Sequence, residues 1–190
     1  MARREEVTDA AIATLAEAGL RGLTHRAVDR AAGLPEGSSS YYFRTRQALL
    51  EATVTRMAEL DDVGFVPADL PPLHPDALAD LVAEVVERAS TTNRARMLAR
   101  YELSIEATRR PELRAALTAV GERYREAAAR LLAAAGAPEP ERQGRVLVAY
   151  LDGLVYDQVA GAGARALSRA EVRASIAETV RGMLGHPSGS

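Results

Sequence analysis

The chain has 190 residues, of which 47% are hydrophobic and 26% are charged, and its net charge is -2. This balance predicts a folded protein with one small and one medium helical domain, and it excludes a polycation, so any affinity for nucleic acid must come from local charge. Without cysteine there is no disulfide or thiolate site, and without a long apolar run there is no signal peptide or membrane span, so we expect a cytoplasmic protein.

A first helix is predicted from about Arg4 to Ala18. Val7, Ala11 and Leu15 recur on one helical face, and Gly19 supplies a stop. We expect this helix to brace the short elements that follow it.

Cap and turn residues divide residues 23–50 into two short helices around a tight turn, which is the pattern of a helix-turn-helix. Thr24 is suited to cap the first short helix, and Gly33 can end it in the left-handed conformation. Pro35 then fixes φ at the start of the second short helix, which we predict from Glu36 to about Tyr42.

Small hydroxyl side chains and tyrosines dominate the second short helix. Such hydroxyls allow a helix to approach base edges in a major groove, while tyrosines reach sugar and phosphate oxygens at the flank. We expect Ser38, Ser39 and Tyr42 to face the groove, and the sequence leaves open whether Ser40 and Tyr41 are partly buried.

Positive charge flanks these helices. Arg44 and Arg46 surround Thr45, the expected N-cap of the next helix, and both are placed for phosphate. His25 and Arg26 begin the first short helix, where backbone N–H groups favour phosphate. A single arginine is more often a solvated surface charge, so we predict phosphate contacts only for the arginines beside the second short helix, which would be the recognition helix. The predicted DNA-binding residues are Thr24, His25, Arg26, Ser38, Ser39, Ser40, Tyr41, Tyr42, Arg44, Thr45 and Arg46.

This segment resembles the DNA-binding domain of TetR-type transcriptional regulators, over about the first quarter of the chain. The matching positions are Leu23, Thr24, Arg26, Val28, Ala32, Gly33, Leu34, Gly37, Ser38, Tyr41, Phe43 and Leu49. We expect Phe43 to fill the core. The departures are Asp29 for a usual alanine, Pro35 for a usual capping serine or threonine, Ser40 for a usual tyrosine, Arg44 for a usual proline and Arg46 for a usual lysine. An ordinary set of short packed helices is the alternative interpretation.

Beyond the resemblance, hydrophobic periodicity and caps predict an all-α chain of about nine helices. A long fourth helix begins after Thr45, reaches about Leu60 and bridges two domains, and a proline-rich linker follows it to Leu73. The later helices are predicted at about Pro75–Ala89, Asn93–Ala107, Pro111–Gly136, Glu141–Val159 and after Ser168. We expect a DNA-binding domain at 1–47, a ligand-binding and dimerisation domain at 48–184, and a flexible tail at 185–190.

The helix at 141–159 is apolar on more than one face, so it should be buried on more than one side. Ser168 and Glu171 form a capping box for the last helix. We predict that these two helices pair with those of a second subunit as a four-helix bundle. The predicted interface residues are Leu151, Gly153, Leu154, Val172, Ile176 and Val180.

A helical domain joined to a helix-turn-helix by a rigid helix is suited to transmit occupancy by a ligand, and the resemblance to TetR-type proteins implies this use. The predicted cavity residues are Met57, Met97, Tyr101, Tyr124 and Tyr150, with Glu102, Ser104 or Asp152 as candidate polar contacts. For any single methionine or aromatic residue, a place in the ordinary core is the better interpretation.

Catalysis is not expected, because His25, His74 and His186 are far apart and no nucleophile motif or phosphate cradle occurs, and we expect no cofactor or metal. We predict a homodimeric repressor whose recognition helices enter successive major grooves of double-stranded DNA, about 34–36 Å apart on a palindromic operator. A small apolar or amphipathic ligand would release it. The sequence leaves open an activator, a regulator without an effector, and a helical binding module or enzyme that retains only the N-terminal fold.

Overall fold

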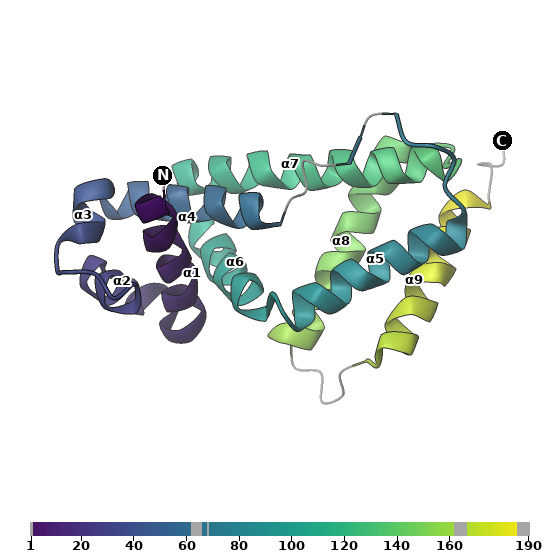
Figure 1. The fold of residues 1–190 in the computed structure, drawn as a ribbon. Helices are drawn as coiled ribbons and strands as arrows, with labels where there is room; N and C mark the ends of the chain where they lie inside the picture. Colours follow the sequence, from purple (N-terminus) through teal and green to yellow (C-terminus); the bar gives the residue numbers. More distant parts are fainter. Residues whose placement is uncertain (1, 62–65, 68, 162–166, 186–190) are drawn as a thin grey trace. The chain divides into compact units, whose positions relative to one another are not determined.

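The computed structural model describes residues 2–61, 66–67, 69–161 and 167–185. The middle of the predicted linker, His186 and most of the predicted tail lie outside these ranges. Within them the chain forms nine helices and no strand, which confirms the predicted all-α fold. The helices are α1 (Ala2–Gly22), α2 (His25–Ala31), α3 (Ser38–Tyr42), α4 (Arg46–Leu60), α5 (Pro75–Ser90), α6 (Arg94–Ala107), α7 (Pro111–Ala134), α8 (Pro140–Val159) and α9 (Arg169–Leu184) (Figure 1).

Three helices, α2, α4 and α9, begin at the side-chain caps that the sequence predicts. Thr24 Oγ1 accepts a hydrogen bond from Ala27 N at 3.1 Å, and Thr45 Oγ1 accepts one from Ala48 N at 3.1 Å. Ser168 forms the expected reciprocal capping box at the start of α9. Each cap satisfies backbone N–H groups that have no partner inside the helix.

Glycines with positive φ mark three helix ends. Gly19 has φ 63°, Gly33 φ 65° and Gly136 φ 85°. This left-handed conformation is open to glycine because it lacks a Cβ atom. The predicted stops at Gly19 and Gly33 are therefore confirmed, and Gly19 interrupts the last turn of α1.

Packing divides the chain into two compact units. One comprises residues 1–62 and 93–121, and the other comprises residues 63–92 and 122–190. This division differs from the predicted functional boundary between 47 and 48, because α4 and α6 both pack with α1 in the first unit. The helix-turn-helix is therefore supported by a core that later parts of the chain complete.

The core of the first unit holds the helix-turn-helix in place. Leu15, Val28, Leu50 and Leu103 come from α1, α2, α4 and α6, and each is at most 1% exposed. Phe43 is 3% exposed and plugs the same core, as predicted. Burial of such side chains stabilises the fold by about 1.5–3 kcal/mol each. α2 and α3 form one end of this unit (Figure 1).

In the second unit, α9 packs its apolar stripe on α5 of the same chain. Val172, Ile176 and Val180 are at most 4% exposed, and Leu78 of α5 is fully buried. The prediction that these three α9 residues form a dimer interface is therefore wrong, because their own subunit already covers them. The hydrophobic pattern of α9 correctly predicts that this face is buried, but α5 of the same chain covers it rather than a second subunit.

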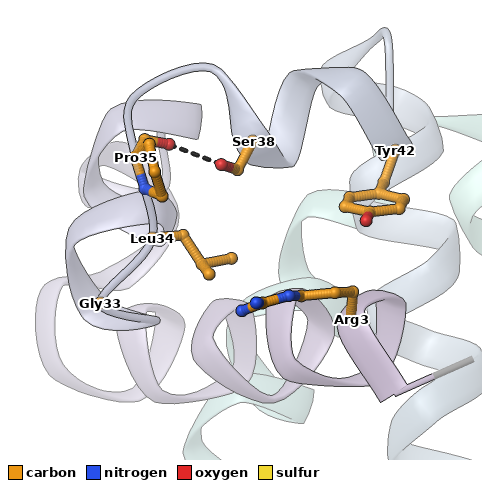
Figure 2. Close-up of a pocket in the computed structure, with 6 residues that line it drawn as sticks. All are labelled: Arg3, Gly33, Leu34, Pro35, Ser38 and Tyr42. Carbon is orange, nitrogen blue, oxygen red and sulfur yellow. Dashed lines mark hydrogen bonds between the residues drawn. The ribbon is translucent and has the colours of Figure 1, made fainter.

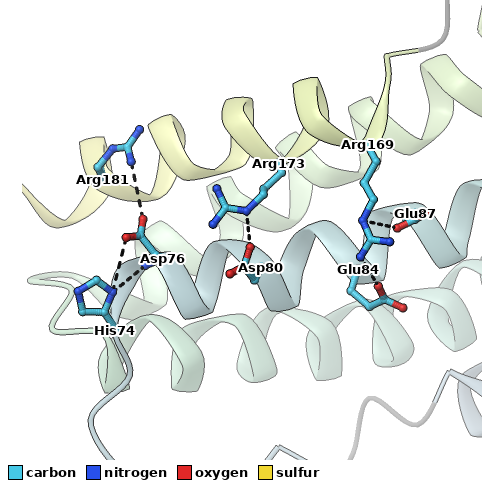
Figure 3. Close-up of polar contacts among 8 residues, drawn as sticks. All are labelled: His74, Asp76, Asp80, Glu84, Glu87, Arg169, Arg173 and Arg181. Carbon is cyan, nitrogen blue, oxygen red and sulfur yellow. Dashed lines mark hydrogen bonds and ion pairs between the residues drawn. The ribbon is translucent and has the colours of Figure 1, made fainter.

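Ion pairs line the contact between α5 and α9. Figure 3 shows three arginines of α9 directed at acidic side chains of α5, in antiparallel order. The pairs are Arg169 with Glu84 (3.1 Å) and Glu87 (3.0 Å), Arg173 with Asp80, and Arg181 with Asp76 (3.8 Å). The charges of the two helices therefore complement one another beside the apolar stripe.

No helix in the described ranges is both long enough and apolar enough to cross a bilayer.

Candidate nucleic-acid interface

The short helix α3 turns one face into the protein. Ser39 is fully buried, and its Oγ donates a hydrogen bond to the backbone carbonyl of His25 at 3.1 Å. Phe43, four residues later, lies in the core. The prediction that Ser39 faces a groove is therefore wrong. A buried serine is tolerated here because its hydroxyl has a hydrogen-bond partner.

Both ends of α3 are held by side chains of α2. Asp29, which is 1% exposed, accepts hydrogen bonds from Gly37 N at 2.8 Å and from Ser39 N at 2.7 Å. At the other end, His25 Nε2 lies 2.7 Å from the carbonyl oxygen of Phe43. Burial would raise the pKa of Asp29, but the hydrogen bonds from Ser39 and Gly37 outweigh it and hold this pKa below its ordinary value.

Sequence reasoning did not identify the role of Asp29, although it noted the residue as a departure. Two signals could have found it: His25 and Asp29 are one helical turn apart on α2, and Pro35 takes the usual place of a capping side chain. The predicted start of α3 at Glu36 is also wrong. The helix begins at Ser38, because Gly37 before it adopts φ 95°.

The outer face of α3 carries Ser40 and Tyr41. Ser40 is exposed, and Tyr41 is 79% exposed, so neither is partly buried. Ser38 and Tyr42 are half-buried at the flank, and the rings of Tyr41 and Tyr42 meet edge to face at 5.2 Å. Of the three residues predicted to face a groove, only Ser38 and Tyr42 have accessible surface.

An open hollow with a volume of about 310 Å³ lies beside this face. Figure 2 shows Arg3 reaching from α1 toward Leu34, while Ser38 and Tyr42 border the hollow from α3. Ser38 Oγ donates to the carbonyl oxygen of Pro35 at 2.7 Å and helps to close the turn. A cation and two hydroxyl groups thus border a concave surface next to the exposed face of α3.

The predicted phosphate ligands have different environments. Arg26 and Arg44 are exposed, and Arg26 forms a solvent-exposed pair with Glu36 at 3.3 Å. Such exposed pairs are weak, so Arg26 can exchange this partner for another anion. Thr24 and Thr45 are exposed while their side-chain oxygens serve as caps.

Arg46 has a structural partner. Its guanidinium donates to the carbonyl oxygen of Leu20, while Leu20 N donates to Glu102 at 3.0 Å. Arg46 and Glu102 thus tie α4 and α6 to the end of α1. Glu102, predicted as a candidate polar contact for a ligand, has this role in the structure.

The residues predicted to line a ligand cavity are divided between the two units. Met57, Met97 and Tyr101 belong to the first unit, and both methionines are buried. Tyr124 and Tyr150 belong to the second, where the hydroxyl groups of Tyr150 and Ser175 form a hydrogen bond between α8 and α9.

One face of α8 is apolar and exposed within the single chain. Val146 is 50% exposed and Tyr156 48% exposed, and Ala149 and Gly153 between them are also exposed. Their spacing of three, four and three residues is that of a coiled-coil seam. A Cβ atom added at Gly153 would meet no atom within 4 Å. Leu151 and Leu154, also predicted for the interface, are half-buried.

An all-helical fold whose helix-turn-helix presents a firmly anchored second helix defines a DNA-binding transcriptional regulator. The family model described as tetR family of bacterial regulatory proteins matches residues 7–53, and that described as tetracyclin repressor-like C-terminal domain matches residues 73–185. The chain therefore belongs to the TetR family of transcriptional regulators.

Solved structures resemble the chain over nearly its whole length. A transcriptional regulator from Rhodococcus sp. RHA1 has a TM-score of 0.78 at 20% identity over 95% of both chains, a likeness that shows the fold alone. A TetR family member from Streptomyces coelicolor A3 has a TM-score of 0.71 at 29% identity, over 94% of this chain and 98% of that one.

The multidrug binding protein EbrR, solved in complex with ethidium, has a TM-score of 0.67 at 31% identity, over 93% of this chain and 98% of that one. Comparison with curated protein sequences gave no match.

Proposed function

We propose that this TetR-family regulator is a homodimeric repressor that reads a palindromic operator in double-stranded DNA through α3. The observation that carries the proposal is the outer face of α3, where Tyr41 is 79% exposed beside Ser40 on a helix anchored at both ends. An exposed aromatic residue with hydroxyl neighbours suits contact with base edges and sugar-phosphate oxygens. A fixed helix presents these groups with little loss of conformational entropy.

Charge around α3 supports the same proposal. Arg26 and Arg44 are exposed beside the helix, and Arg3 borders the adjacent hollow. Since the net charge of the whole chain is -2, affinity for DNA must come from these local cations. We assign phosphate contacts to Arg26, Arg44 and Arg3. Arg46 is retained as a weaker candidate because it donates to Leu20.

The dimer proposed here uses the exposed seam on α8, defined by Val146, Ala149, Gly153 and Tyr156. An apolar seam with a central glycine allows two copies of α8 to approach closely around a two-fold axis. The two recognition helices would then enter major grooves about 34–36 Å apart.

Gly153→Arg tests this seam, and Gly182→Arg on α9 is the matched control. Both glycines are exposed, and a Cβ atom at either position would meet nothing within 4 Å in the single chain, so each position has room for the start of a side chain. We expect light scattering to give a dimer mass for the wild type and Gly182→Arg, and a monomer mass for Gly153→Arg. A dimer that survives Gly153→Arg would exclude the α8 seam.

We further propose that a small apolar or amphipathic ligand releases the protein from DNA. The ethidium complex of EbrR supports this ligand class, since that protein is 31% identical. Within the second unit the proposed lining residues are Tyr124 and Tyr150, with Tyr150 contributing its ring because its hydroxyl contacts Ser175. A ligand weakens DNA binding only by its differential affinity for two conformations, typically about 1–3 kcal/mol. The proposed location is the cytoplasm.

The decisive experiment is selection of bound duplexes from a random DNA pool by the purified full-length protein near physiological salt. An enriched palindrome supports the proposal and supplies a probe for ligand screening. Weak and uniform binding to all duplexes would refute it and favour a helical module without DNA-reading function. A reporter gene placed under the selected operator then distinguishes repression from activation.

Salt dependence tests the assignment of Arg44. Arg44→Ala should weaken binding to every duplex and reduce the slope of log affinity against log salt by about one unit. The matched control is Arg88→Ala on α5, which removes an exposed arginine from the second unit. Identical slopes for the two variants would remove Arg44 from the proposed phosphate contacts.

A further inference from the structure

The recognition helix α3 has no cap of its own. It contains only five residues, and its N-cap residue Gly37 makes no side-chain hydrogen bond. Where the TetR-type pattern has a capping serine or threonine, this chain has Pro35. A helix this short is not stable by itself, and its first N–H groups need acceptors from elsewhere.

The buried carboxylate of Asp29 supplies these acceptors from α2. One oxygen accepts from Gly37 N at 2.8 Å and the other from Ser39 N at 2.7 Å. Asp29 stands where the TetR-type pattern has alanine. The two departures compensate each other, because Pro35 removes a local cap and Asp29 provides one from the neighbouring helix. Hydrogen bonds to a charged acceptor are stronger than those between neutral groups.

His25 fixes the opposite end of the same helix. It precedes Asp29 by one turn of α2, so both side chains lie on one face of that helix. His25 Nε2 lies 2.7 Å from the carbonyl oxygen of Phe43, and the carbonyl oxygen of His25 accepts from Ser39 Oγ at 3.1 Å. With both ends held, α3 has little freedom to rotate about its axis or to tilt. Its rotation decides whether Ser40 and Tyr41 project outward.

We propose that Asp29 is a specificity-determining positioning residue, which acts through α3 by capping it from α2 and so orients Ser40 and Tyr41 toward base edges. This inference rests on the proposed role of α3 in reading DNA. It assigns Asp29 no contact with DNA. Loss of Asp29 should therefore reduce discrimination between sequences, while the exposed arginines still bind the phosphates of any duplex.

The test compares three variants of the full-length protein with the wild type. Asp29→Ala removes the cap. Glu36→Ala is the matched control, because it also removes one negative charge near α3, and Glu36 is an exposed residue of the turn that pairs with exposed Arg26. Asp29→Ala combined with Pro35→Ser tests rescue. Ser38 N already donates to the carbonyl oxygen of residue 35 at 3.1 Å, so a serine hydroxyl there lies near the uncapped N–H groups.

The measured quantity is the ratio of the affinities for the operator selected by the wild type and for a scrambled duplex of equal length at one salt concentration. Asp29→Ala should lower this ratio roughly five- to tenfold, as expected for a lost helix cap. Glu36→Ala should raise both affinities and leave the ratio unchanged, since it only removes negative charge near DNA. Pro35→Ser should return the ratio of the Asp29→Ala protein toward the wild-type value.

The ratio separates positioning from mere stabilisation, because a destabilised but folded population keeps its specificity. If Asp29→Ala does not fold, Asp29→Asn retains one carbonyl acceptor and replaces it in the same comparison. A wild type that selects an operator, with an unchanged ratio in the Asp29 variant, refutes the positioning role and leaves the proposed function intact. A wild type that selects no operator refutes both.

Discussion

The contact between α7 and α8 is a close backbone approach of two helices that a single substitution can test. Gly144 of α8 is buried, and a Cβ atom added there would lie 2.9 Å from Ala129 N and 3.1 Å from Arg125 O on α7. These are backbone atoms inside a helix, so they cannot rotate away. Gly144→Ala therefore forces α8 away from α7, and overpacking of this kind costs about 1–3 kcal/mol.

Gly182→Ala on α9 isolates this cost. Replacement of glycine by alanine inside a helix contributes about 1 kcal/mol of helix propensity at either position. At Gly182 a Cβ atom would meet nothing within 4 Å, so only the propensity term acts. The difference in unfolding free energy between the two variants is then the packing cost alone, and Gly144→Ala should be the less stable by about 1–3 kcal/mol.

Urea denaturation followed by circular dichroism measures this difference. Both variants should be compared with the wild type at one protein concentration, because the stability of a dimer depends on concentration. If Gly144→Ala is as stable as Gly182→Ala, the close approach of α8 to α7 is wrong. The support for the outer face of α8 as the dimer seam would then be lost too, since the same contact sets which face of α8 is outward.

Acid, charge and cap variants test three separate contacts. Burial would raise the pKa of Asp29, but hydrogen bonds from α3 outweigh it and hold this pKa below 3.8. Its stabilisation is therefore complete above about pH 4 and is lost as the pH falls through the lowered pKa, so the advantage of the wild type over Asp29→Asn in unfolding free energy should shrink steadily as the pH falls below about 4; an advantage that does not change with pH would contradict this role. Arg56 binds Asp9 through two nitrogens at 2.8 and 3.2 Å, a geometry that lysine cannot reproduce. Arg56→Lys should therefore lower the unfolding free energy by about 1 kcal/mol, measured by urea titration. An unchanged midpoint would exclude this pair as a tie between α1 and α4. Ser168→Ala should lower the thermal midpoint through loss of about 1 kcal/mol at the α9 cap, whereas Ser168→Asp should retain it; equal midpoints would contradict the capping role.

Local signals predicted the ends of the elements well. Thr24, Thr45 and Ser168 cap the helices that the sequence assigned to them, and Gly33 ends α2 with a positive φ. A cap depends on residues within three or four positions of one another, so its chemistry is fully present in the local sequence. The start of α3 was misplaced because Gly37 and Pro35 both favour turns, and the sequence does not rank them.

The candidate site was predicted less completely. Three consecutive serines give α3 no hydrophobic contrast, so periodicity could not show that Ser39 faces inward while Ser40 faces outward. Ser39 can be buried because its backbone N–H donates to Asp29 and its hydroxyl donates to the carbonyl oxygen of His25. Both acceptors lie on another helix, α2. Contacts between elements decide the orientation of a helix of five residues.

By itself the sequence determined the all-α class, the order of the helices, their caps and the presence of a helix-turn-helix, because these depend on local backbone chemistry and hydrophobic period. The tertiary structure alone decided which surface covers each apolar stripe. The stripe of Val172, Ile176 and Val180 packs on α5, whereas the seam with Val146 and Tyr156 remains exposed on α8. Hydrophobic periodicity specifies that a face is to be buried, but the partner of that face depends on the packing of segments far apart in the chain.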